Sequence, residues 1–156
     1  MIKLYHGTNT EFTNIDLTLC KPNKDFGRGF YLTDIRNQAV DMARRRTIIA
    51  CGSPIVHTFL FDDSVIASGE LSVKIFDGVS EEWANFIIEN RKRRGGTHNY
   101  DVVIGPIADD GVVMQIDRYL NRMIDMPTLI KELTLRKLNR QYYFGTERSL
   151  KYLKRI

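Results

Sequence analysis

Hydrophobic and polar positions along the chain follow two different periods. Runs rich in β-branched and aromatic residues, which are typical of strands, occupy residues 2–5, 30–33, 55–62, 71–76, 100–110 and 141–144. Apolar residues spaced three or four apart, which are typical of helices, occupy residues 34–49, 80–94 and 146–153, with two short helices within 114–139. Strands and helices do not alternate regularly, so we expect an α+β fold with a mainly antiparallel sheet.

Capping and breaking residues mark the ends of several predicted helices. Thr33 or Asp34 is a candidate N-cap for the first long helix, and Thr146 is one for the last helix. Two arginines followed by two glycines, residues 93–96, predict the end of the helix that begins near residue 80. A break at residues 126–127, Met-Pro, separates the two short helices.

Length and composition are those of one compact domain spanning residues 1–156. The chain has 156 residues, 43% of them hydrophobic and 27% charged, which is enough to bury a core. No run approaches the roughly 20 apolar residues of a membrane-spanning helix. The two cysteines, Cys20 and Cys51, lie far apart in sequence and are most simply interpreted as reduced thiols. We therefore expect a cytoplasmic protein with no membrane partner.

Charge is distributed unevenly along the chain. Residues 118–156 contain 10 basic and 3 acidic side chains, whereas residues 1–117 contain 13 basic and 16 acidic ones. A basic C-terminal quarter can face nucleic acid, a nucleotide or an acidic protein, and it can equally be a solvated helix face. A basic nucleic-acid-binding protein is therefore one function class to keep, and its binding would be sensitive to salt.

Common cofactor and metal motifs are absent from the sequence. The Gly27-Arg28-Gly29 segment has no third glycine and precedes a predicted strand, whereas a dinucleotide fingerprint follows a strand and opens a helix. The sequence has no cluster of His and Cys at metal-ligand spacing and no nucleophile elbow. We therefore expect no metal cofactor.

Three separated segments remain as candidates for chemistry. They are His6-Gly7-Thr8 at the end of the first strand, Phe26-Gly-Arg-Gly-Phe-Tyr31 at the start of the second, and Gln141 on a late strand. Each has a structural explanation alone, since histidine can hold a loop and glycines can form turns. In this order they resemble the ADP-ribosyltransferase superfamily, in its poly-ADP-ribose-polymerase-like His-Tyr-x branch. More narrowly, nearly the whole chain resembles a bacterial family of uncharacterised domains found beside putative antitoxins.

The resemblance implies a split antiparallel β-sheet core with flanking helices and a site for NAD, used as a substrate. It implies that His6 binds the adenosine ribose and that the backbone of Gly7 holds the nicotinamide amide. Thr8 would support His6 through a hydrogen bond. Tyr31 would line the nicotinamide pocket, and Met42 occupies the position of a second stacking aromatic in the family.

The same comparison assigns the glycine-rich segment to the wall of the pocket. Phe26 opens this segment, and Gly27 and Gly29 would let the chain bend tightly. Arg28 would project towards the phosphates of NAD. Together with His6, Gly7, Thr8, Tyr31 and Met42, these residues are the predicted NAD-binding set.

Catalysis in this branch usually depends on a glutamate of the late strand, which holds the ribose 2′-hydroxyl and stabilises positive charge. Gln141 occupies that position here and has no charge, so an electrostatic contribution is missing. Either Gln141 acts with a slower transfer, or a carboxylate from elsewhere replaces the glutamate. Asp109 and Asp110 are the main candidates for that carboxylate, Glu147 is a further one, and a solvated turn is the alternative explanation for the aspartates.

Taken together, these features predict an NAD-dependent ADP-ribosyltransferase with catalytic residues among Gln141, Tyr31, Asp109 and Asp110. By resemblance, it would be the toxin of a bacterial toxin–antitoxin pair. Its acceptor would be a protein or a nucleic acid, and a small antitoxin protein would be a partner. The alternatives are a catalytically weak or silent module that binds NAD or ADP-ribose, and the basic nucleic-acid-binding protein.

Overall fold

The computed structural model describes residues 1–92 and 98–156. The helix that begins near residue 80 was predicted to end at residues 93–96, and these residues lie outside the described ones. The elements, in chain order, are β1 (Ile2–Thr8), η1 (Leu17–Leu19), β2 (Phe30–Leu32), α1 (Arg36–Ala50), β3 (Ile55–Phe61), α2 (Val65–Ser68), β4 (Val73–Ile75), α3 (Glu81–Lys92), β5 (Val102–Pro106), α4 (Asp110–Leu120), α5 (Met126–Thr134), β6 (Arg140–Phe144), α6 (Glu147–Leu150) and β7 (Leu153–Arg155).

The strands form two sheets, which confirms the α+β class. One sheet has the order β1-β3-β7 and the other the order β2-β6-β5-β4. Each neighbouring pair is antiparallel except β4 and β5, which are parallel. The sheets meet where β1 and β2 exchange two backbone hydrogen bonds, between Tyr5 and Thr33, at 2.8 and 3.0 Å. The three predicted motifs therefore lie on β1, on β2 with the loop before it, and on β6.

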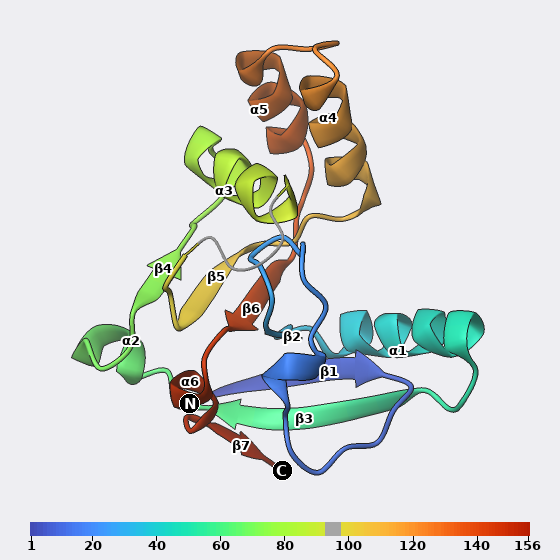
Figure 1. Cartoon of the computed structure of the whole chain (residues 1–156), viewed down its shortest axis with the longest axis vertical. Helices are drawn as coiled ribbons and strands as arrows, with labels where there is room; N and C mark the ends of the chain where they lie inside the picture. Colours follow the sequence, from blue (N-terminus) through green and yellow to red (C-terminus); the bar gives the residue numbers. More distant parts are fainter. Residues whose placement is uncertain (93–97) are drawn as a thin grey trace.

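The longer helices lie in two separate places on the molecule (Figure 1). α1 lies along β1, and α3, α4 and α5 lie together beyond the β5 and β6 end of the second sheet. Both chain ends are at the end of the molecule that carries β3 and β7. The loop 20–29 runs between these two groups of helices, so the glycine-rich segment lies near the middle of the molecule.

Alternation along β6 divides the hydrophobic core in two. Tyr142 and Phe144 point into a cluster with Leu4, Phe59 and Phe61 of the β1–β3 sheet. Tyr143 points the other way, into a cluster that contains Phe26 and helices α3, α4 and α5. Because side chains two apart on a strand share a face, Gln141 lies on the Tyr143 face, under the glycine-rich loop.

Several predicted elements differ from those in the structure. The chain ends in a strand, because residues 153–155 pair with β3, so the predicted helix to residue 153 stops at residue 150. α4 begins at Asp110, within the predicted strand 100–110, because Asp109 accepts a hydrogen bond from the backbone of Val112 and caps the helix. α1 begins one residue beyond Ile35, which provides no side-chain cap, so neither Thr33 nor Asp34 is the N-cap.

The predicted cap of the last helix is confirmed. Thr146 caps α6 in a reciprocal capping box with Ser149. Cys20 and Cys51 are free thiols. No helix within residues 1–92 and 98–156 has the length and apolarity needed to cross a bilayer.

Candidate functional site

His6 lies on β1, next to the isolated bridge that Tyr5 forms with Thr33. Its Nδ1 is 2.8 Å from the carbonyl oxygen of Tyr31, and its ring packs on Phe30 with centroids 4.4 Å apart. A carbonyl oxygen can only accept a hydrogen bond, so Nδ1 carries the hydrogen and donates it. In the neutral imidazole, Nε2 is then an acceptor, suited to a hydroxyl group.

Surroundings keep this imidazole neutral. Burial, with smaller effects of Arg46 and His57, lowers the pKa of His6 to about 4, against the opposing effect of the hydrogen bond to Tyr31. At neutral pH the ring therefore offers one donor, which Tyr31 uses, and one acceptor.

The lowered pKa predicts how the stability of the protein depends on pH. The imidazole has a pKa of about 6.5 in the unfolded chain and about 4 in the folded one. As pH falls from 6.5 to 4, the unfolded state gains a proton that the folded state does not, so the free energy of unfolding decreases by about 2–3 kcal/mol. Urea unfolding of wild type and His6→Gln between pH 4 and 7 measures this difference, with a shallower pH dependence expected in the variant. Identical pH dependence in both proteins would contradict the assignment.

Gly7 and Thr8 complete β1 with structural contacts. A Cβ on Gly7 would lie 1.9 Å from the carbonyl oxygen of Ala39, so the missing side chain makes room for α1. The hydroxyl of Thr8 accepts a hydrogen bond from the backbone of Thr10 at 3.2 Å. His6 bonds to the Tyr31 carbonyl oxygen. The resemblance implied a hydrogen bond between Thr8 and His6, and these two described residues do not form one.

Tyr31 holds the glycine-rich loop through its hydroxyl. The hydroxyl accepts a hydrogen bond from the backbone N–H of Phe26 at 3.0 Å and donates one to the carbonyl oxygen of Gly27 at 2.7 Å. Burial, with Asp25 nearby, raises the pKa of Tyr31 well above its usual range, so the hydroxyl keeps its hydrogen. Gly27 has φ +89°, a left-handed conformation that favours glycine. The ring of Tyr31, rather than its hydroxyl, is what remains for a ligand.

The rest of the loop is fixed from β6. Tyr143 donates a hydrogen bond from its hydroxyl to the backbone oxygen of Arg28 at 2.9 Å, and a Cβ on Gly29 would lie 2.2 Å from its ring. Phe26 is completely buried beside these aromatic rings. Arg28 itself has an exposed side chain, which donates to the carbonyl oxygen of Thr18 at 3.3 Å.

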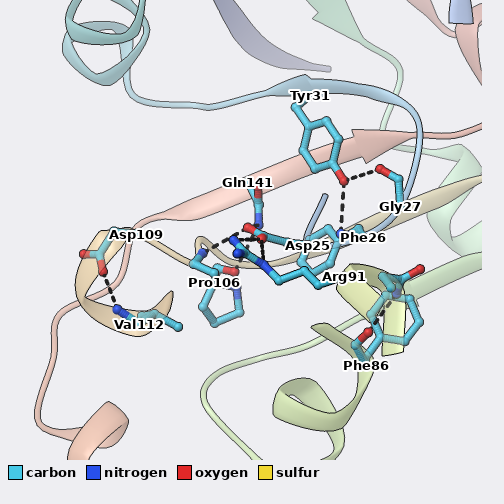
Figure 2. A network of polar contacts seen from close by, with 12 residues as sticks. Asp25, Phe26, Gly27, Tyr31, Phe86, Arg91, Pro106, Asp109, Val112 and Gln141 are labelled. Atoms are coloured by element: carbon cyan, nitrogen blue, oxygen red, sulfur yellow. Dashed lines mark hydrogen bonds and ion pairs between the residues drawn. The ribbon is translucent and has the colours of Figure 1, made fainter. Parts of the chain in front are cut away.

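Gln141 belongs to a buried polar network whose centre is Asp25 (Figure 2). Its Nε2 donates to Asp25 Oδ2 at 3.2 Å and lies 3.4 Å from the carbonyl oxygen of Pro106. Oδ2 of Asp25 also accepts from the backbone of Ala108 at 3.3 Å. Oδ1 accepts from the guanidinium of Arg91 on α3, at 2.6 and 2.9 Å. Asp25 and Gln141 are 7% and 6% exposed, so their hydrogen bonds are made away from bulk water.

Asp25 is the site residue that sequence reasoning missed. It comes directly before Phe26 in the glycine-rich segment, so an acidic residue next to this motif was the available signal in the sequence. Its burial is known only from the structure. Its partners Arg91 and Gln141 are 66 and 116 residues away along the chain. No local pattern connects them, so only the fold reveals the network.

Four of the other predicted residues do not join this network. Asp109 and Asp110 are exposed at the start of α4, where Asp109 bonds to Val112 (Figure 2). Glu147 is exposed in the first turn of α6. Met42 is 40% exposed on α1. Asp109 is therefore a solvent-exposed helix cap, which is close to the solvated turn given as the alternative explanation.

Basic side chains lie close to His6 and to the segment before the glycine-rich loop. The positive charges of Arg46, Lys21 and Arg91 act with burial to lower the pKa of Lys24. Arg46 also contributes to the low pKa of His6. The segment before the glycine-rich loop and the middle of α1 therefore share one electropositive region, which favours an anionic ligand.

Two hollows lie away from these residues. One of about 390 Å³ is bordered by α4 and Met123, and one of about 460 Å³ is bordered by Lys92, Tyr119 and Ile124. Within residues 1–92 and 98–156, no three His, Cys, Asp or Glu side chains come together as metal ligands.

Comparison with known proteins matches residues 2–155 to one family profile, whose description is "Protein of unknown function (DUF3990)". No curated protein and no solved structure matches the chain.

Proposed function

We propose a function for this chain from its own residues, because the chain belongs to the DUF3990 family, whose function is unknown. The proposed function is that of an NAD-dependent ADP-ribosyltransferase, which moves ADP-ribose from NAD to a protein or nucleic-acid acceptor. NAD is the substrate and no metal takes part.

The observation that carries the proposal is the hydrogen bond between His6 Nδ1 and the Tyr31 carbonyl oxygen. It brings together the two motifs on which the resemblance to ADP-ribosyltransferases rests. It also leaves Nε2 of a neutral imidazole as an acceptor. A ribose hydroxyl is the donor that such an acceptor fits.

The arrangement of strands is consistent with the same proposal. The resemblance implied a split antiparallel core, and the chain has two sheets that meet at β1 and β2. His6, Tyr31 and Gln141 lie on the three strands β1, β2 and β6. β2 pairs with β6, and the residue after β2, Thr33, forms an isolated bridge with β1. The electropositive region of Arg46 and Lys24 would suit the diphosphate of NAD.

The proposed chemistry breaks the bond between C1′ of the nicotinamide ribose and the ring nitrogen of nicotinamide. The bonding electron pair leaves with nicotinamide, which becomes neutral, and positive charge develops on the ribose. An acceptor oxygen or nitrogen then bonds to C1′ and loses its proton. Orientation of NAD and stabilisation of the charge on the nicotinamide ribose are the tasks left to the protein. His6 is the polar group for the adenosine ribose, and Gln141 is the one for the nicotinamide ribose.

The test is release of nicotinamide from NAD, together with transfer of labelled ADP-ribose to components of a bacterial lysate. Wild type is expected to do both. His6→Ala is expected to reduce nicotinamide release about 100-fold, because the adenosine ribose loses its hydrogen-bond acceptor and NAD loses its orientation. Urea unfolding checks that the variant is folded. Folded wild type that neither releases nicotinamide nor labels any acceptor would refute the proposed activity.

A second candidate is a module that binds NAD or ADP-ribose without turnover. The neutral amide of Gln141 and the exposed Met42 favour it, since neither supplies a charge or an aromatic face. Calorimetric binding of NAD without nicotinamide release would support this function. Salt-sensitive binding of nucleic acid without any effect of NAD would instead support a nucleic-acid-binding protein.

Biological context follows from the resemblance alone. A transferase of this kind in the cytoplasm of a bacterium would act as a toxin, and a small antitoxin protein would restrain it. Co-expression with the product of a neighbouring gene is the direct test of that partner.

A further inference from the structure

We propose that Asp25 is a positioning residue for Gln141: its buried carboxylate orients and polarises the Gln141 amide, so that Oε1 accepts a hydrogen bond from the ribose hydroxyl next to the breaking bond. This inference rests on the proposed transferase function and deepens it. It assigns the missing negative charge to a residue one hydrogen bond behind the late strand.

The orientation of the Gln141 amide follows from its partners. Nε2 has two hydrogens, and two acceptors lie next to it, Asp25 Oδ2 at 3.2 Å and the Pro106 carbonyl oxygen at 3.4 Å. Neither acceptor can donate a hydrogen, so the reversed amide would place Oε1 against two oxygens. The amide is therefore fixed with Nε2 inward.

Oε1 is the atom left for a ligand. In the described part of the chain, every fully buried polar side-chain atom has a hydrogen-bond partner. Both hydrogen bonds of the Gln141 side chain are made by Nε2, and Oε1 makes none. Oε1 is therefore reached by solvent, although the residue is only 6% exposed. An acceptor held in one orientation and not fully buried can receive a hydrogen bond from a ribose hydroxyl.

Asp25 adds charge to this acceptor without reaching the ligand itself. Both of its oxygens are occupied, Oδ1 by Arg91 and Oδ2 by Gln141 and the Ala108 N–H. A carboxylate that accepts from Nε2–H polarises the amide and makes Oε1 more negative, which suits a site where positive charge develops. Arg91 holds Asp25 in place and offsets part of its field, which explains how a buried carboxylate is retained here.

The experiment moves the charge between the two positions. Steady-state nicotinamide release is measured for wild type, Asp25→Asn, Gln141→Glu and the double variant, with Asp117→Asn on α4 as the matched control. In Asp25→Asn, kcat should fall about 100-fold with little change in KM, because the charge and the amide orientation are lost. In Gln141→Glu, two carboxylates meet, so kcat should also fall.

The double variant separates a catalytic effect from a structural one. Glu at 141 beside Asn at 25 restores one carboxylate hydrogen-bonded to one amide, so kcat should recover at least 10-fold over Asp25→Asn. A purely structural role for Asp25 predicts no such rescue. A double variant no faster than Asp25→Asn, or an Asp25→Asn within threefold of wild type, would overturn the inference.

A measurement without turnover keeps this result separate from the proposed activity. The side-chain amide signals of Gln141 in a nitrogen–proton NMR spectrum are identified by their loss in Gln141→Glu. They are expected to shift in Asp25→Asn and to stay in place in Asp117→Asn. Unshifted signals would overturn the positioning role even in an active enzyme, whereas shifted signals in a protein that releases no nicotinamide would refute the transferase function alone.

Discussion

Replacing Trp83 with alanine is expected to lower the free energy of unfolding by about 3–5 kcal/mol. Trp83 lies in α3, is completely buried and belongs to the cluster that α3, α4 and α5 form with Phe26. Its removal leaves a large cavity. It also removes a hydrogen bond, since Nε1 donates to the Pro106 carbonyl oxygen at 3.2 Å. Total stabilities of domains are about 5–15 kcal/mol, so the loss would be a large part of the whole. Urea unfolding at pH 7 measures it.

The variant Trp83→Phe is the matched control for packing. It keeps most of the apolar volume and loses the hydrogen bond, so its cost should be clearly smaller than that of alanine. Because Pro106 also lies beside Nε2 of Gln141, this control tests whether the indole N–H helps to hold that carbonyl in place. Equal costs for the two variants would contradict the cavity as the main effect.

Alanine at Gly7 is also expected to destabilise the protein strongly. The new Cβ would lie 1.9 Å from the carbonyl oxygen of Ala39 and 3.0 Å from the backbone nitrogen of Ala43. These atoms belong to the backbone of α1 and cannot rotate away, so the helix must move off β1. We expect a loss of about 1–3 kcal/mol or more in the free energy of unfolding, measured by urea.

Gly78→Ala is the control for this change, because no atom lies within 4 Å of its added Cβ. It should leave stability nearly unchanged. A displaced α1 would also carry Arg46 away from His6, so the pKa of His6 in Gly7→Ala should move back towards 6.5. A Gly7→Ala protein as stable as Gly78→Ala would show that the helix is not packed as described.

Much of the fold could be predicted because local patterns determine it. The strand 55–62 and the helix 80–94 have clear periods, and Thr146 has capping chemistry, so these elements appear close to where they were expected. Leu153–Arg155 escaped prediction because three residues have little local preference, and only pairing with β3 makes them a strand. Asp109 was placed at the end of the predicted strand 100–110, since a cap is recognised only when the helix that follows it is known.

The candidate site divides in the same way. Its glycines and Tyr31 could be found in sequence because they stand in short motifs, and the structure brings Tyr31 into contact with both His6 and the loop. The carboxylate next to Gln141 could not be found by searching near residue 141, because four separate chain segments supply the Asp25 network. The roles of these residues towards NAD remain predictions for the experiments above.

The position of β7 has a consequence for how the protein is made. β3 lies between β1, which carries His6, and β7, so residues from both ends of the described chain flank one strand. A ribosome completes β7 after every other element described here, and until then one edge of β3 stays open. Contacts this distant in sequence also slow folding. The sheet that contains His6 is therefore complete only after residue 155 has been synthesised.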